Sequence, residues 1–313
     1  MNTEDSQVKL GSTIPERIGN TPLLRLEQIV RDLPGVTLLG KAEWTNPSGS
    51  VKDRAASAIV RDAIARKLLT PGKTLLDATG GNTGIAYAML GAALGFPVHL
   101  AIPASLSPER KRILALYGAT VDWTDPAEAS DGAIRRAREL AGNDPARFCY
   151  VDQFSNDANW LAHFHTTGPE IWRQTAGQVT HFIAGLGTTG TFMGTARSLK
   201  GFYATLQAIS VRPAAPVHGL EGLIHSSASI VPPIYNPHLS NRTAEIETEA
   251  ARAMAKRMAR EEGLLVGPSA AAAVVASLQI AQEEAAAGRS AVIVVILPDA
   301  ADRYLSSPFW TDL

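Results

Sequence analysis

A chain of 313 residues is long for a single hydrophobic core and favours two lobes. Hydrophobic residues make up 45% and charged residues 19%, which excludes an intrinsically disordered protein. Lys and Arg number 29 against 30 Asp and Glu, so no electrostatic argument favours nucleic acid or an anionic membrane as a partner.

The single cysteine, Cys149, excludes an internal disulfide and indicates a reducing, cytoplasmic compartment. We expect it to be a buried structural thiol. The N-terminus has no apolar segment typical of a signal peptide. Two apolar stretches without a formal charge, 85–104 and 264–282, are each interrupted by a glycine and a proline. We therefore predict buried helices and strands there instead of membrane spans.

Predicted strands and helices alternate along almost the whole chain. The predicted strands are 36–44, 73–78, 97–103, 147–154, 181–185, 206–211 and 291–299. The predicted helices are 50–68, 83–94, 107–118, 191–200, 244–263 and 269–288. Apolar strands that alternate with amphipathic helices predict an α/β fold of parallel sheets covered by helices on both faces.

The likeliest division of such a chain is a small lobe inserted into a larger one. We expect the small lobe to span 45–148 and the large lobe to consist of 1–44 and 149–313. A ligand cleft is expected between them.

Three segments rich in glycine and hydroxyl residues lie where predicted strands end and helices begin. They are "NPSGSVKDR" (46–54), "ATGGNTG" (78–84) and "AGLGTTGTFMG" (184–194). In parallel α/β sheets, ligands bind at such junctions. These segments are therefore the candidate functional loops.

Lys52 in the first segment stands at the start of a predicted helix, where the helix dipole disfavours a cation. Two interpretations remain open. The side chain bends to water, or the position destabilises the ammonium form so that the free amine can act as a nucleophile.

The third segment combines glycines, which let the backbone approach a ligand closely, with threonine hydroxyls. Free N–H groups at a helix start bind anions, and a phosphate is the natural guest. The alternative is a glycine-rich turn without a ligand. The segment also spells G-x-G-x-x-G, which makes an NADP-dependent oxidoreductase a rival, with Arg212 placed for a 2′-phosphate. It is not a P-loop, because Thr191-Phe192 replaces the required Lys-Ser/Thr.

The second segment precedes another predicted helix. Its backbone N–H groups and the hydroxyls of Thr79 and Thr83 suit a carboxylate, and the Asn82 amide suits a phenolate-like oxygen. A plain helix cap is the alternative. A nucleophilic amine, a phosphate site and a carboxylate site together indicate an aldehyde cofactor with a phosphate and an amino-acid substrate, which is pyridoxal 5′-phosphate chemistry.

With these motifs the chain resembles the fold type II pyridoxal-phosphate enzymes, specifically the cysteine synthases (O-acetylserine sulfhydrylases), nearest to cysteine synthase B. The resemblance extends from 18–26 to 297–306 and includes "VGPSAAA" and 153–172. It implies that Lys52 is the catalytic Schiff-base lysine. It implies that the cofactor is held by Lys52, Asn82, Gly187, Thr188, Thr189, Gly190, Thr191 and Ser269. It implies that the substrate is bound by Thr79, Gly80, Gly81, Thr83 and Gln153.

The resemblance also implies a reaction. O-acetylserine and a sulfur nucleophile give cysteine and acetate through an aminoacrylate, with Lys52 as the general base. Ser269 would leave the pyridine nitrogen neutral, which favours β-elimination over transamination. No metal is implied. The implied partners are a small amino-acid substrate and a second copy of the chain in a homodimer, with a sulfur-carrier protein as one of the sulfur donors that the residues leave open.

Several positions depart from the family pattern. Gly80, Ala270, Ala300 and Ala301 replace residues that relatives usually have as serine or glycine, and 217–225 replaces a glycine-rich gate. These departures leave a non-catalytic homologue as an alternative. No Lys or Arg occurs between residues 213 and 241 to bind a second phosphate, which favours O-acetylserine over O-phosphoserine. A cystathionine-forming synthase is a further alternative, and we interpret His218 and His225 as ordinary loop histidines.

Overall fold

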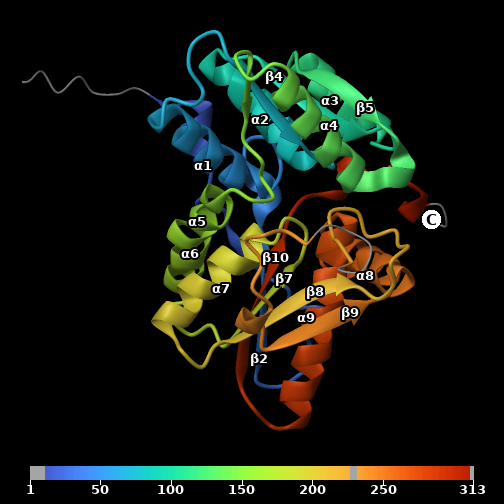
Figure 1. The fold of residues 1–313 in the computed structure, drawn as a ribbon. Helices are drawn as coiled ribbons and strands as arrows, with labels where there is room; N and C mark the ends of the chain where they lie inside the picture. The colour runs from blue at the N-terminus through green and yellow to red at the C-terminus, as the bar shows by residue number, and fades with distance from the viewer. Residues whose placement is uncertain (1–10, 226–230, 311–313) are drawn as a thin grey trace, which may run out of the picture.

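The computed structural model describes residues 11–225 and 231–310, which form two sheets surrounded by helices (Figure 1). The larger sheet has six strands in the order β1-β2-β10-β7-β8-β9. Its strands are β1 (Leu23–Arg25), β2 (Val36–Ala42), β7 (His181–Gly185), β8 (Gln207–Pro213), β9 (Arg242–Ile246) and β10 (Ala291–Leu297). Only the β1–β2 pair is antiparallel among these described strands.

The central strand β10 explains why helices cover both faces of this sheet. Its run AVIVVIL is apolar at every position, as a strand buried on both sides requires. Ile293 and Val295 pack into a core with helices α8 (Thr248–Glu261) and α9 (Pro268–Ala286). Val294 and Ile296 point the other way, into a core with α7 (Gly190–Phe202). The period of two along the strand therefore divides its side chains between two cores.

The smaller sheet has four parallel strands in the order β5-β4-β3-β6. They are β3 (Thr74–Ala78), β4 (Val98–Pro103), β5 (Thr120–Thr124) and β6 (Phe148–Tyr150). The core on one face contains side chains of α1 (Lys52–Ala65), α2 (Asn82–Leu94) and α3 (Pro108–Leu116). The core on the other face contains side chains of α4 (Ala129–Asn143). Parallel sheets with helices on both faces confirm the predicted α/β class.

The remaining described elements are two helices and six short 3-10 helices. Helices α5 (Asp157–His165) and α6 (Thr167–Gln174) lie beside α7 (Figure 1). The short 3-10 helices are η1 (Ile14–Arg17), η2 (Glu43–Thr45), η3 (Pro126–Glu128), η4 (Pro237–Leu239), η5 (Ala301–Arg303) and η6 (Pro308–Trp310). We propose that the two sheets mark two lobes, 45–148 and the rest of the chain, with the β6 residues after 148 completing the small sheet.

The start of the predicted helix 244–263 is wrong. The sequence predicts a helix over 244–263, but Arg242–Ile246 forms β9 and the helix begins at Thr248. Ala and Glu favour helices in isolation, yet pairing with β8 and the alternating burial of Ala244 and Ile246 stabilise a strand here. Tertiary pairing thus overrides the local preference. The sequence also does not indicate β1, β5 and α4 to α6.

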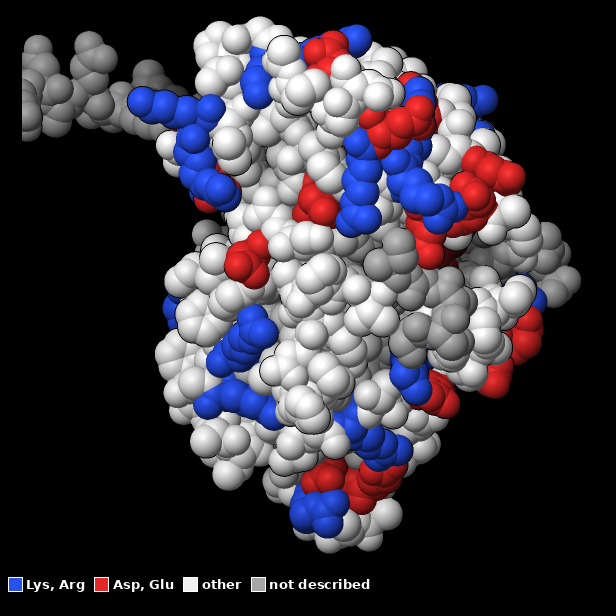
Figure 2. All heavy atoms as spheres, viewed as in Figure 1, with Lys and Arg blue, Asp and Glu red and all other residues white. Residues whose placement is uncertain are grey.

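The distribution of charge on the surface and the burial of the single cysteine agree with what the composition predicts. Acidic and basic side chains lie next to one another on the face in Figure 2, without a continuous patch of either sign. Cys149 is buried in β6, as predicted, and burial raises the pKa of its thiol. Among the described helices, none combines the length and the hydropathy that a bilayer crossing requires.

Candidate active site

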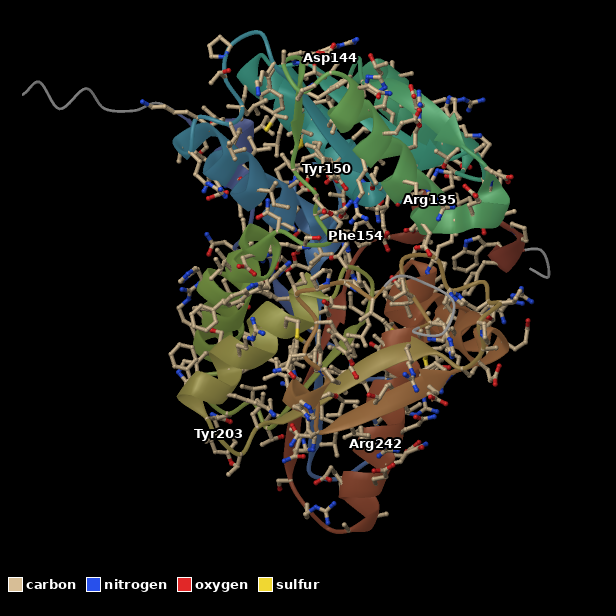
Figure 3. All side chains as sticks on the ribbon, in the orientation of Figure 1. Arg135, Asp144, Tyr150, Phe154, Tyr203 and Arg242 are labelled. Carbon is tan, nitrogen blue, oxygen red and sulfur yellow. The ribbon has the colours of Figure 1, made fainter. Side chains whose placement is uncertain are left out.

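Two adjoining cavities contain almost all of the predicted site residues. The first is lined by, among others, Lys52, Thr79, Gly80, Gly81, Asn82, Thr83 and Gln153. The second is lined by, among others, Lys52, Asn82, Gly187, Thr188, Thr189, Thr191 and Ser269. Gly190 lines neither cavity but is the first residue of α7 beside them. Phe154, which also lines the first cavity, lies between the parts that carry the two sheets (Figure 3).

Lys52 is the first residue of α1 and borders both cavities. The preceding turn needs Gly49, because its φ of 84° is left-handed and a Cβ there would collide with the Arg303 guanidinium. The Lys52 amine forms no hydrogen bond or ion pair with any residue in the described part of the chain. Burial lowers the pKa of Lys52, and the nearby Asp299 carboxyl only partly opposes this effect. These features favour a neutral, reactive amine over a side chain that bends to water.

The third segment leads into α7 with several free donors. The backbone N–H groups of Gly187, Thr188 and Thr189 have no hydrogen-bond partner within the described residues. Thr189 adopts a left-handed φ of 70°, and its buried hydroxyl also has no partner there. Gly190 is required, because a Cβ there would collide with the side-chain amide of Asn159. This arrangement is suited to bind an anion such as a phosphate.

The threonine side chains of this segment are positioned by helix α5. Asn159 Nδ2 donates to Thr188 Oγ1 at 3.0 Å, and His163 Nε2 lies 3.2 Å from Thr191 Oγ1. Burial lowers the pKa of His163 to about 3, so its imidazole is neutral. Neither Asn159 nor His163 was recognised as functional in the sequence, although both lie in the stretch 153–172.

Thr79 in the second segment caps a helix, which is the alternative that the sequence left open. Thr79 Oγ1 accepts hydrogen bonds from the N–H groups of Gly81 and Gly84, at 3.1 and 3.2 Å. Thr79 therefore caps the start of α2. A Cβ at Gly80 would meet nothing within 4 Å, so a serine side chain would fit there without rearrangement.

Gln153 joins this segment to strand β3. Thr83 Oγ1 donates to Gln153 Oε1 at 2.7 Å, and Gln153 Nε2 donates to the Ala78 carbonyl at 2.6 Å. The backbone N–H of Gln153 donates to the Asp77 carboxyl at 3.2 Å. Asp77 is a buried acid inside the apolar strand TLLDA, a pattern that could have identified it in the sequence.

The buried Asp77 carboxyl is expected to make the unfolding free energy depend on pH. Burial raises the pKa of its carboxyl to about 8, against about 4 in an unfolded chain. The stability that this group contributes is therefore complete below pH about 4 and is lost as pH rises through about 8. We expect the unfolding free energy of wild type to fall relative to Asp77→Asn by up to about 1.4 kcal/mol per pH unit in this range. Urea unfolding of both proteins at pH 5.5 and 7.5 measures it, and a constant difference would contradict it.

Asn82, the first residue of α2, has its amide held at both ends. Nδ2 donates to Asp299 Oδ2 at 2.6 Å and lies 3.3 Å from the Tyr304 hydroxyl, while Arg303 donates to Asn82 Oδ1 at 2.9 Å. Tyr304 also donates to Asp299. These three partners follow β10 and were not recognised in the sequence. They orient the amide so that Nδ2 faces Asp299 and Tyr304.

The two alanines in the same stretch participate through their backbone. Ala300 forms a bridge with Val266, and the N–H of Ala301 donates to the Leu265 carbonyl at 3.1 Å. These bonds use backbone atoms alone, so they do not depend on the side chains at 300 and 301. Ser269, near the start of α9, is buried against the second cavity, and no residue in the described part of the chain bonds to its hydroxyl.

Arg110 is the most informative residue that the sequence analysis missed. Among the described residues that line the first cavity, only Lys52 and Arg110 are charged. Arg110 is buried, and its Nη2 pairs with Glu221 from the segment after β8. The run "ERKR" in the predicted helix gave no reason to separate it from its solvated neighbours.

Residues of the rival interpretations are occupied elsewhere. Arg212 pairs with Glu245, so it is not free for a 2′-phosphate. His218 and His225 do not line either cavity. Within 11–225 and 231–310, no three His, Cys, Asp or Glu side chains are grouped to hold a metal ion.

Comparisons with known proteins agree with this geometry. Residues 14–299 match the family model described as "Pyridoxal-phosphate dependent enzyme". The chain is 48% identical to a cysteine synthase from Aquifex aeolicus over 97% of its own length and 94% of the relative. It is 40% identical to cysteine synthase B from Pseudomonas aeruginosa, over 94% of the chain and 96% of the relative.

Solved structures show the same similarity. O-acetyl serine sulfhydrylase isoform 3 from Entamoeba histolytica superposes with a TM-score of 0.89 at 33% identity, covering 100% of this chain and 95% of the other. Both the family model and the relatives extend over nearly the whole chain. The chain therefore belongs to the family of pyridoxal-phosphate dependent enzymes, and within it to the cysteine synthases.

Proposed function

We propose that this enzyme makes cysteine by replacing the acetoxy group of O-acetyl-L-serine with a sulfur nucleophile. The observation that carries the proposal is the convergence on adjoining cavities of a partner-free lysine, an anion-binding helix start and a second loop suited to a carboxylate. Relatives named cysteine synthase at 48% and 40% identity support it.

The residues present fit pyridoxal phosphate. The partner-free N–H groups of 187–189 and the buried, unpaired Thr189 hydroxyl would hold its phosphate. Lys52 would hold its aldehyde, Asn82 would face the ring hydroxyl, and Ser269 would face the ring nitrogen. A Cβ at Gly187 would collide with the Gly222 carbonyl, so only glycine fits at this point of the cavity wall. We propose these roles, and those of the substrate loop, for the residues named.

The cofactor supplies an electron sink for the pair left when the α-proton of the substrate is removed. Residues of this chain do the rest. The loop of Thr79 to Thr83 presents N–H groups to the substrate carboxylate, and Gln153 holds Thr83 in place at 2.7 Å. Lys52 Nζ would take the α-proton, and burial lowers the pKa of this amine, which favours the neutral form that a general base requires. Neutral Ser269 does not add a charge at the ring nitrogen.

The test is cysteine formation by the purified holoenzyme. We expect the protein to be yellow and to convert O-acetyl-L-serine and sulfide to cysteine and acetate, with a new absorption band when O-acetyl-L-serine is added alone. A colourless protein that binds NADPH would support the oxidoreductase alternative instead. A yellow protein that forms product only with O-phosphoserine, or only with homocysteine as the nucleophile, would contradict the proposed substrates.

The same assay with sulfide, thiosulfate and a thiocarboxylated carrier protein as donors would identify the sulfur source by cysteine yield. We further propose a cytoplasmic homodimer. The single, unpaired Cys149 supports the compartment. Size-exclusion chromatography with light scattering measures the oligomeric state, and a monomeric mass would contradict it.

A further inference from the structure

An ion pair beside the first cavity joins distant parts of the chain. Arg110 lies on α3, which packs against the small sheet, and Glu221 lies between β8 and β9 of the large sheet. Apart from Lys52, Arg110 brings the only charge to the described lining of this cavity. The segment 213–241 has no Lys or Arg for a substrate phosphate, but the fold brings a cation to the cavity from residue 110.

The Arg110 guanidinium is held on several sides. Nε donates to Ser107 Oγ at 2.9 Å, and the group lies 4.7 Å from the centroid of the Tyr304 ring. Nη2 pairs with Glu221. Nη1 has no hydrogen bond to any described residue and lies 2.9 Å from where a Cβ on Gly81 would stand. Its unpaired nitrogen therefore borders the loop proposed to bind the substrate.

Glu221 offsets this positive charge. A buried arginine with a free edge binds phosphate esters well, because its N–H groups match phosphate oxygens. Glu221 binds Nη2 of the guanidinium, and its carboxylate repels a phosphate that carries about −1.5 to −2 charge at pH 7. An acetyl ester is neutral and is not repelled. Rejection by like charge is a common way to obtain specificity.

We propose that the Arg110–Glu221 pair determines the leaving group, admitting activated serines with an uncharged ester and excluding those with a phosphate. This inference rests on the proposed function and names the feature that decides between its two candidate substrates. Arg110 supplies a potential phosphate contact, and Glu221 cancels it.

The test is Glu221→Gln, which preserves the shape and a hydrogen-bond acceptor but removes the charge. We measure kcat/KM for O-phospho-L-serine and for O-acetyl-L-serine with sulfide, and expect the ratio of the two to rise about tenfold or more. The matched control is Glu283→Gln, which changes net charge equally. Glu283 pairs with Arg242 at the far end of the large sheet from Phe154 (Figure 3) and should leave the ratio unchanged.

A second variant tests the role of Arg110. Adding Arg110→Met to Glu221→Gln should return the ratio to the wild-type value or below it, because the gain depends on the guanidinium. Titration calorimetry of the holoenzymes with O-phospho-L-serine, without a sulfur donor, should show about tenfold tighter binding for Glu221→Gln than for wild type.

The outcomes separate the two proposals. If wild type makes cysteine from O-acetyl-L-serine but Glu221→Gln changes neither the ratio nor the calorimetric affinity, this inference is overturned and the proposed function stands. If wild type makes no cysteine from O-acetyl-L-serine while Glu221→Gln binds O-phospho-L-serine more tightly, the proposed function fails and the charge selection stands. A gain that persists after Arg110→Met also overturns the inference.

Discussion

Replacing Lys52 by alanine is expected to remove the yellow colour of the enzyme and to reduce cysteine formation by about 10²–10⁴-fold or more. Lys52 borders both cavities, its amine bonds to no residue within 11–225 and 231–310, and burial lowers its pKa. Alanine cannot hold the cofactor aldehyde, and it cannot accept the α-proton of the substrate. Absorbance spectra and the rate with O-acetyl-L-serine and sulfide measure both losses.

The matched control is Lys73→Ala. Lys73 lines neither cavity, and its amine donates to the exposed Pro145 carbonyl at 3.5 Å. This variant should keep the colour and the rate of wild type. A small primary amine added to Lys52→Ala should restore part of the rate, because it can serve as the missing base. Full colour and rate in Lys52→Ala would refute the role proposed for this lysine.

Replacing Arg54 by methionine is expected to lower the free energy of unfolding by about 3–5 kcal/mol. Arg54 lies two residues after Lys52 and is buried between two acids. It donates to Glu43 at 2.8 and 2.9 Å and to Glu170 at 2.8 Å. Lys41 also donates to Glu170, at 2.7 Å, so two cations balance two anions in the interior. Removing Arg54 leaves one buried carboxylate without a counter-charge.

The electrostatics support this expectation. Burial alone would raise the pKa of Glu170, but Arg54 and Lys41 hold it down at about 2, so this carboxylate is charged near neutral pH. Urea unfolding measures the loss in Arg54→Met. Adding Glu43→Gln should recover part of the stability, because it restores the balance of one cation and one anion.

A surface pair provides the comparison. Arg66 is exposed and pairs with Asp62 at 3.2 Å, so Arg66→Met should change the unfolding free energy by less than about 1 kcal/mol. Equal effects of Arg54→Met and Arg66→Met would mean that the buried network contributes no more than an exposed pair. Arg54 belongs to the helix that begins at Lys52, so the network also anchors this helix.

Features encoded within a few consecutive residues could be predicted from the sequence. The α/β class, the helix that starts near Lys52 and the loops at 78–84 and 184–194 depend on local patterns of apolar residues, glycines and helix starts. The turn that a glycine with positive φ allows, and the anion binding by N–H groups at a helix start, depend on neighbouring residues and need no distant partner. The cofactor type and the family were accessible for this reason.

Features that depend on distant partners required the tertiary structure. The β9 strand at 242–246 is stabilised by pairing with β8, against its local preference for helix. Asn82 bonds to Asp299, 217 residues later in the chain, and Arg110 bonds to Glu221, 111 residues later. Side-chain hydrogen bonds and ion pairs act over about 3 Å, so which charges meet is decided only when the sheets and helices are packed. The loops proposed to bind the cofactor could therefore be found from local sequence patterns, whereas the charged groups that line the candidate site, such as Arg110, were decided by the packing of distant elements.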